Sequence, residues 1–238
     1  MNHHQKHFPL RLLAVATLLA MVPLQGAWAK AAPPALGRAL PFAVLGGTNV
    51  TCTNGSITGD VGVSPGGAVP FTDTGCPITG NKPPATNTAA AGGRSDFLRT
   101  FDALRLRSTS CTHVPGNLAG ENLSPGVYCV DTVAKAGVLT LSGPSTGVWI
   151  FLGDGALTGT GFTVNILGGG KACNVWWAPN TGVTMNTSTF QGNILAGSVG
   201  YGSITFTGGT LNGRALADIA VTTTGTVITR AAGTGCSK

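Results

Sequence analysis

Short apolar runs separated by glycine, proline and asparagine dominate the pattern of this chain. Runs such as residues 42–45, bounded by turn-forming residues, are typical of β-strands. One long stretch has a different period. Residues 88–107 contain no proline, and their apolar residues recur on one helical face at Phe97, Leu98, Phe101 and Leu104. The pattern predicts a chain built mainly of strands, with one amphipathic helix over about 88–107 that packs against an apolar surface.

The charged residues of this helical segment have the spacing of ion pairs along a helix. Asp96 and Arg99 are three residues apart, as are Asp102 and Arg105. Side chains three residues apart are neighbours on a helix surface. We therefore expect both pairs to form on the solvated side of the helix.

An internal repeat organises the rest of the chain. Residues 183–196 align without a gap with residues 204–217, and looser copies of the same opening begin at Leu157, Val221 and Val50. From Leu157 onward, successive copies begin 26, 21 and 17 residues apart. A period of roughly 20 residues with several short strands per copy predicts an all-β solenoid. Because the helix separates the copy at Val50 from the others, we expect a discontinuous solenoid with the helix packed alongside.

The opening of each copy is an apolar residue, a threonine, any residue, and then a threonine or an asparagine. Side chains alternate between the two faces of a strand, so an inward apolar residue places the second and fourth positions outward. Those positions are Thr51, Thr53, Thr158, Thr160, Thr184, Asn186, Thr205, Thr207, Thr222 and Thr224. Stacked strands lie about 4.8 Å apart and positions i and i+2 about 6.6 Å apart, which predicts two parallel columns.

These columns suit a repeating ligand, and the repeating ligand with similar spacings is ice. The χ1 angle of threonine is stiff because of β-branching, so little side-chain entropy is lost when an ordered surface binds. The alternative explanation is that threonine is favoured on strands in general. Five copies in one phase favour a binding face.

Composition narrows the function classes further. Charged residues make up 9% of the 238-residue chain, which also contains 37 glycines. Outside residues 1–29, His113 is the only histidine, and 12 basic residues face 8 acidic ones, for a net charge near +4. Such a chain has little material for acid–base catalysis or a multi-histidine metal site. Its basic residues form no stripe, which argues against a nucleic-acid partner.

The amino-terminal segment has the features of a secretion signal. Lys6 and Arg11 precede an apolar run over residues 12–24 that is too short to span a bilayer, and Ala27-Trp28-Ala29 forms an A-x-A cleavage site. We expect residues 1–29 to be removed and residues 30–238 to form one exported domain without membrane insertion.

Several motifs along the chain resemble the DUF3494-type ice-binding proteins of bacteria and fungi. The matching segments, in the order of that family, are residues 42–47, 59–66, 123–128, 148–151, 174–177, 192–196 and 212–217. The resemblance covers nearly the whole expected mature chain. It implies a right-handed discontinuous β-helix with a flanking α-helix, adsorption to ice through the Thr-x-Thr face, no cofactor and no catalysis.

Six cysteines lie in the expected exported part, and an even number in an oxidising compartment predicts up to three disulfides. Six cysteines allow 15 pairings, and buried free thiols are the alternative. Cys52 is inward in the first copy and Cys76 lies about one coil later, so these two could meet in the core. Cys111 and Cys129 bracket the segment after the helix, which leaves Cys173 for Cys236. Some relatives of the resembled family carry a disulfide in a cap, and residues 108–130 occupy the place of that cap.

The remaining motifs carry less weight. The run 168–171 lacks the spacing of a phosphate loop and is interpreted as a corner. Isolated aspartates at Asp60, Asp154 and Asp218 are more typical of turns than of a calcium site. The tryptophans Trp149, Trp176 and Trp177 could form a sugar platform, but their apolar strand context favours core packing.

Three functions follow in order of preference. The first is a secreted, monomeric ice-binding protein that is not an enzyme. The second is a cell-surface or matrix adhesion module that binds glycan or protein on the same scaffold. The third, a polysaccharide lyase of the β-helix type, is disfavoured because no cluster of aspartates with a nearby Arg or Lys appears at solenoid spacing.

Overall fold

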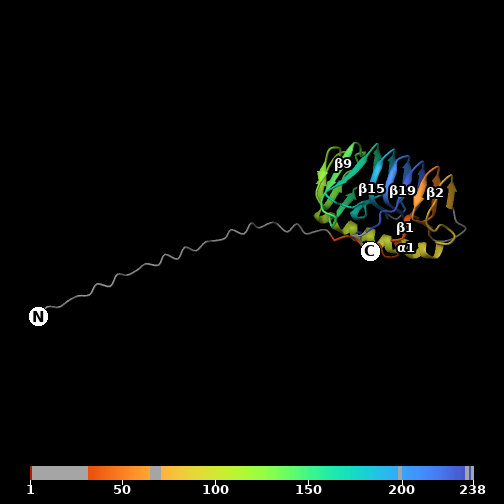
Figure 1. Cartoon of the computed structure of the whole chain (residues 1–238), viewed down its shortest axis with the longest axis horizontal. Coiled ribbons are helices and arrows are strands. Elements are labelled where there is room, and N and C mark those ends of the chain that lie inside the picture. The colour runs from red at the N-terminus through yellow and green to blue at the C-terminus, as the bar shows by residue number, and fades with distance from the viewer. Residues whose placement is uncertain (2–31, 65–70, 198–199, 234–235, 237–238) are drawn as a thin grey trace.

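Two parallel β-sheets and one long helix make up the protein (Figure 1). The protein was analysed as a computed structural model, which describes residues 1, 32–64, 71–197, 200–233 and 236. Sheet A has 13 strands and sheet B has six, and all strand pairs recorded among these residues are parallel. Apart from residue 1, the predicted signal segment lies outside the described residues.

The strands are short, as the spacing of turn residues predicts. Sheet A comprises β1 (Phe42–Gly46), β3 (Ser56–Thr58), β4 (Asp60–Val63), β6 (Thr112–Val114), β7 (Asn122–Leu123), β8 (Gly126–Val130), β9 (Val138–Ser142), β10 (Trp149–Gly153), β12 (Thr163–Leu167), β13 (Val175–Pro179), β15 (Thr189–Ala196), β17 (Thr210–Ala217) and β19 (Val227–Thr229). Sheet B comprises β2 (Asn49–Thr53), β5 (Phe71–Thr74), β11 (Leu157–Thr160), β14 (Val183–Asn186), β16 (Ile204–Thr207) and β18 (Ala220–Thr224).

From β14 onward the chain passes alternately between the two sheets. Two-residue turns join β14 to β15, β16 to β17 and β18 to β19, and similar turns follow β2 and β11. The first residue of each turn has positive φ: Asn54, Gly161, Thr187, Gly208 and Gly225. Glycine adopts this conformation without steric penalty, and asparagine tolerates it. The sheets therefore meet along one corner built from stacked left-handed residues.

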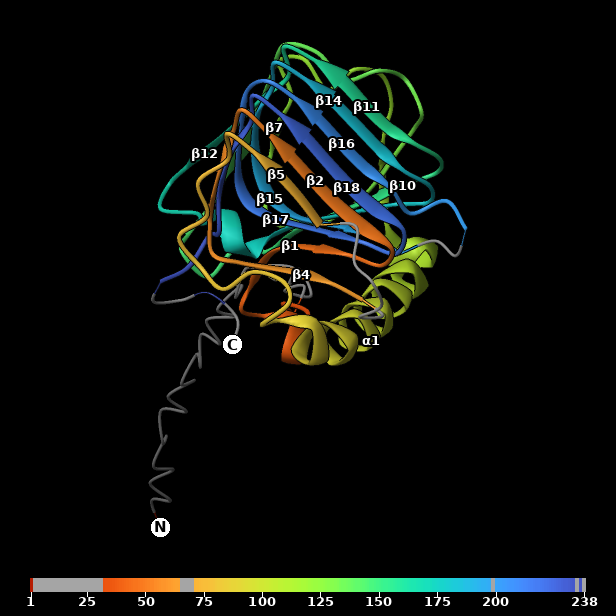
Figure 2. The same cartoon turned by 90° about the vertical axis from the view of Figure 1, so that its right-hand side faces the viewer.

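Sheet A bends where β15 and β17 pass from one side of the molecule to the next. Gly192 and Gly213 are paired in the middle of these two strands. A Cβ atom on Gly213 would lie 1.8 Å from the carbonyl oxygen of Gly192, so only glycine fits there. The bend gives the molecule three sides: sheet B, and one part of sheet A on each side of the paired glycines (Figure 2).

Helix α1 (Asn87–Arg105) covers one of these sides, and a 3₁₀-helix, η2 (Leu106–Ser110), continues it. The expected helix over about 88–107 is therefore observed, with its last residues in the tighter 3₁₀ form. Phe97, Phe101 and Leu104 are buried against the outer surface of sheet A, in one cluster with Leu195 and Leu216. The prediction that the helix packs on an apolar surface is confirmed.

The covered part of sheet A is apolar on both faces. In β10 and β13 all five residues are buried. Trp149 and Trp177 point into the interior, where Trp177 stacks on Phe151 with ring centroids 4.0 Å apart, whereas Trp176 belongs to the cluster beneath α1. Parallel strands covered on both faces have continuous apolar sequences, which explains these runs.

Only one of the two expected helical ion pairs is present. Arg99 Nη1 lies 3.0 Å from Asp96 Oδ1. Arg105 is bound elsewhere: its Nη1 donates to the carbonyl oxygens of Gly153 at 2.9 Å and Ala178 at 3.2 Å. These carbonyls lie near the carboxyl ends of β10 and β13, where a long cationic side chain can satisfy them.

Three disulfides join the six cysteines as Cys52–Cys76, Cys111–Cys129 and Cys173–Cys236. These are the pairs predicted from the sequence. The first lies in the interior, the second links the start of β6 to β8, and the third holds residue 236 near η3 (Ala172–Asn174).

An ion pair attaches the amino-terminal part of the domain to α1. Asp96 accepts hydrogen bonds from the backbone N–H of Arg38 at 2.9 Å and from its Nε at 3.0 Å. Arg38 follows the first residue of η1 (Gly37–Ala39), the 3₁₀-helix that contacts α1. The hydrogen bonds from the Arg38 side chain, then from its backbone, lower the pKa of Asp96 to about 2.

We predict that this interaction makes stability depend on acid pH. A carboxylate whose pKa falls on folding stabilises the protein above its unfolded pKa, and the contribution is lost progressively as the pH falls through the folded pKa, between about pH 5 and pH 1. Because the Arg38 side chain is 64% exposed, solvent screening weakens this contribution. Asp96→Asn should thus be less stable than wild type at pH 7, by a difference that shrinks as the pH falls through about 2, as measured by urea unfolding. Asp102→Asn, at an exposed site of the same helix, is the control. A wild-type advantage that stays constant with pH would contradict the prediction.

Candidate functional site

The threonines of the repeat lie side by side on sheet B. The strand order is β11-β14-β16-β18-β2-β5, and the register pairs Thr158 with Thr184, Thr184 with Thr205, and Thr205 with Thr222. β2 follows directly, since Thr222 pairs with Thr51 and Thr224 with Thr53. All ten residues selected from the sequence are thus brought together in two columns, although β2 and β18 are far apart in sequence.

Alternation along each strand directs these columns outward. In β14 the burial pattern is buried, exposed, buried, exposed, with Val183 and Met185 inward and Thr184 and Asn186 outward. In β16, Ile204 and Phe206 are fully buried, while Thr205 is partly exposed and Thr207 is exposed. The inward side chains belong to the main hydrophobic cluster, so the core holds the outward positions in place.

Sheet B contains one further strand that extends both columns. β5 pairs with β2 so that Thr72 lies beside Thr51 and Thr74 beside Thr53. The sequence interpretation missed this strand, although Phe71-Thr72-Asp73-Thr74 has the same opening as the other copies. β5 departs from the pattern at Asp73, whose carboxylate lies 2.6 Å from Lys82 Nζ.

The resulting surface, named the Thr face, comprises Thr51, Thr53, Thr72, Thr74, Thr158, Thr160, Thr184, Asn186, Thr205, Thr207, Thr222 and Thr224. None of these side chains is charged. Neighbours within a column repeat at the strand spacing of about 4.8 Å. Eleven hydroxyl groups and eleven methyl groups of stiff side chains are therefore presented at regular intervals.

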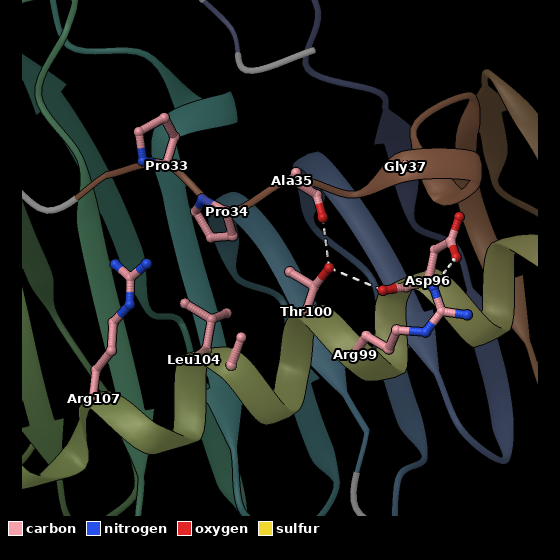
Figure 3. A pocket seen from close by; sticks show the side chains of 10 residues that line it. Pro33, Pro34, Ala35, Gly37, Asp96, Arg99, Thr100, Leu104 and Arg107 are labelled. Carbon is pink, nitrogen blue, oxygen red and sulfur yellow. Dashed lines mark hydrogen bonds and ion pairs between the residues drawn. The ribbon is translucent and has the colours of Figure 1, made fainter.

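A groove of about 540 Å³ lies elsewhere, between residues 33–37 and α1 (Figure 3). Thr100 Oγ1 donates to the carbonyl oxygen of Ala35 at 2.6 Å across its floor. Arg99 binds Asp96, and Arg107 Nη1 donates to the carbonyl oxygen of Ala32 at 3.1 Å. The polar groups of the groove thus attach residues 32–37 to α1. The residues that line the groove contain no pair of nucleophile and base.

Cys111, His113 and Cys129 gather near the end of sheet A, with their ligand atoms within 4.8 Å of one another. Such a group could hold a metal ion if both thiols were free. The two sulfurs are joined in a disulfide here, so neither is available as a thiolate. The sequence spacing does not reveal this group, because it depends on the register of β6 with β8.

The tryptophans and the isolated aspartates have structural roles. Trp149, Trp176 and Trp177 are each at most 1% exposed, which excludes a sugar platform and supports core packing for all three. Asp60 accepts a hydrogen bond from the backbone N–H of Asn81, and Asp218 pairs with Arg94 of α1. The Asp60 carboxylate thus binds a neighbouring loop, and the Asp218 carboxylate binds α1.

The protein is a mostly parallel β-sheet protein with one long helix. The helix lies on one side of the molecule, and a regular, uncharged threonine surface lies on another. Within the described part of the chain, no helix is long and apolar enough to cross a membrane.

Comparison with known proteins assigns the family. The ice-binding-like family model matches residues 44–229. An ice-binding protein of Flavobacterium frigoris (strain PS1) is 34% identical over 207 residues, which cover 79% of this chain and 72% of that protein. An ice-binding protein of Flammulina populicola is 33% identical over 215 residues, covering 80% and 85%. The crystal structure of an ice-binding protein from an Antarctic biological consortium aligns with a TM-score of 0.71 at 30% identity, covering 84% of this chain and 92% of that one. The chain belongs to the ice-binding-like family.

Proposed function

We propose that this protein adsorbs to ice through the Thr face and restrains the growth or recrystallisation of the crystals. The observation that carries the proposal is the register of sheet B, which aligns twelve outward positions in two uncharged columns. Family membership supports the same ligand.

The chemistry of the side chains supports this mode of binding. Each threonine offers a hydroxyl group that can hold an ordered water molecule and a methyl group that disfavours ordinary hydration. Because buried neighbours and β-branching fix the rotamers, binding an ordered lattice restricts few additional degrees of freedom. Adsorption requires no bond cleavage, so we propose that the protein is not an enzyme.

We further propose that the two sheets form a discontinuous right-handed β-solenoid. The alternation of the chain between sheets from β14 to β19 supports this description, as does the pairing of β2 with the distant β18. In this fold every outward threonine column follows from the stacking of coils.

Export as a monomer completes the proposal. The charged start, the short apolar run and the A-x-A site within residues 1–29 support removal of this segment. We predict that the secreted chain begins at or near Lys30, as determined by amino-terminal sequencing of material from the medium or periplasm. Recovery of intact residues 1–29 on exported protein would show that the segment is not cleaved.

Ice affinity on a cold finger, together with thermal hysteresis, tests the function directly. The purified protein should be incorporated into slowly growing ice and should lower the freezing temperature of the crystals below their melting temperature. Serum albumin at equal concentration should stay in the liquid. If the protein stays with albumin and shows no hysteresis, ice binding is rejected, and retention on immobilised glycan would then favour adhesion.

A further inference from the structure

A second exposed surface lies next to the Thr face, on the outer side of β3, β19, β17 and β15. Its first column is Ser56, Val227, Thr210 and Thr189, and its second column is Thr58, Thr229, Asn212 and Gln191. All eight positions are in register, and none is charged. Named the second face, this surface repeats the two-column arrangement of the Thr face.

The packing beneath the second face is as regular as that beneath the Thr face. Ile57, Leu211, Ile228 and Phe190 alternate with its outward residues and are at most 1% exposed. On the surface, Asn212 Nδ2 donates to Gln191 Oε1 at 2.9 Å, which orders the two longest side chains of this face. The outward groups therefore have defined positions, which a rigid ligand requires.

The second face is continuous with the Thr face. The two-residue turns after β14, β16, β18 and β2 carry the chain directly from one surface to the other. At the first position of these turns stand Thr187, Gly208, Gly225 and Asn54, of which Gly208 is half-buried and the others are exposed, and none of these residues is large. The first residues of these turns therefore place no bulky or charged side chain between the two surfaces along this corner.

The third side of the molecule differs in chemistry. There α1 covers the sheet, and the helix carries charged residues including Asp96, Asp102 and Arg99. The eight outward positions of the second face are uncharged, and Lys171 and Arg230 border its second column, where they line a hollow together with Asn212 and Thr229. A neutral lattice of hydroxyl and amide groups matches a neutral lattice of water.

We propose that the second face is an additional ice-docking surface, so that one molecule can contact two crystal planes that meet at an angle. This inference rests on the proposed function. The second face contributes less than the Thr face, because Val227 interrupts a hydroxyl column and because amides occupy two positions of the other.

Single tyrosine substitutions on each face distinguish the contribution of the Thr face to ice binding from that of the second face. Thermal hysteresis and the planes of an ice hemisphere bound by fluorescent protein should be compared for wild type, Thr205→Tyr, Thr210→Tyr and the double variant. Thr109→Tyr, at an exposed position of η2, is the matched control. Melting temperatures verify folding, and Thr229→Tyr on β19 is measured beside Thr210→Tyr as a second variant of the same face.

We expect Thr210→Tyr to lower hysteresis in part and to remove some of the bound planes. Thr205→Tyr should retain a weak activity that the double variant loses. If Thr210→Tyr and Thr229→Tyr match wild type in both measurements, the second face is not an ice site, while the Thr face stands. If only Thr210→Tyr loses activity, the second face stands and the Thr face is rejected. A wild-type protein without ice affinity overturns both proposals.

Discussion

Replacing Thr205 by tyrosine is expected to remove most of the thermal hysteresis of the protein. Thr205 lies near the middle of sheet B, with Thr184 on one side and Thr222 on the other. A phenol ring at this position stands above the threonine methyl groups and holds both neighbouring strands away from a planar crystal. A substitution near the edge of the sheet, at Thr72, should have a smaller effect because it has a neighbour in sheet B on one side only.

Folding should be unaffected by this change. The side chain of Thr205 points away from the core, and surface substitutions usually change stability by no more than about 0.5 kcal/mol. Thr184→Tyr should behave in the same way, whereas Thr109→Tyr on η2 should retain full activity. Retained hysteresis in both Thr205→Tyr and Thr184→Tyr, with wild type active, would show that ice binds elsewhere.

Replacing the next residue, Phe206, by alanine is expected to destabilise the fold by roughly 3 to 5 kcal/mol, in contrast to Thr205→Tyr, which should leave stability unchanged. Phe206 is fully buried, and its ring meets that of Phe190 edge-on with centroids 6.2 Å apart. Truncation removes apolar contacts and leaves a cavity between sheet B and β15. The rest of the core cannot close this cavity without moving the strands that Met185 and Thr223 occupy on either side.

Urea unfolding without reductant measures this loss and keeps the disulfides intact in both states. Phe206→Leu, which retains most of the buried volume, should be destabilised much less than Phe206→Ala. A decrease below about 1 kcal/mol for Phe206→Ala would show that the cavity collapses at little free-energy expense. Together, the variants at Thr205 and Phe206 test whether the outward residue of this strand governs ice binding while the adjacent inward residue governs stability.

Local periodicity in the sequence accounts for much of this molecule. The apolar spacing of Phe97, Phe101 and Leu104 predicts α1, because a helical face is defined by neighbours within one or two turns. The alternation in residues 183–186 likewise predicts which side chains of β14 point outward, because the two sides of a strand follow from its own backbone. Both properties depend on local geometry, and the structure agrees with both.

Other features depend on which strands pair with one another. The sequence shows that Val50 and Val221 open similar copies, but their pairing, across the segment that contains the helix, is a property of the assembled sheet. The same holds for Arg105, whose partners are carbonyl groups of β10 and β13 rather than the nearby Asp102. Long-range contacts of this kind are set by the packing of elements that are remote in sequence.

The sequence by itself therefore determined the types of element, the outward threonines of five copies and the set of cysteines available for pairing. Only the tertiary structure decided that β5 adds Thr72 and Thr74 to the columns, and that β3, β19, β17 and β15 align a second polar lattice beside the first. The physical reason is that orientation within a strand is a local consequence of backbone geometry, whereas register between parallel strands arises from contacts between residues remote in sequence.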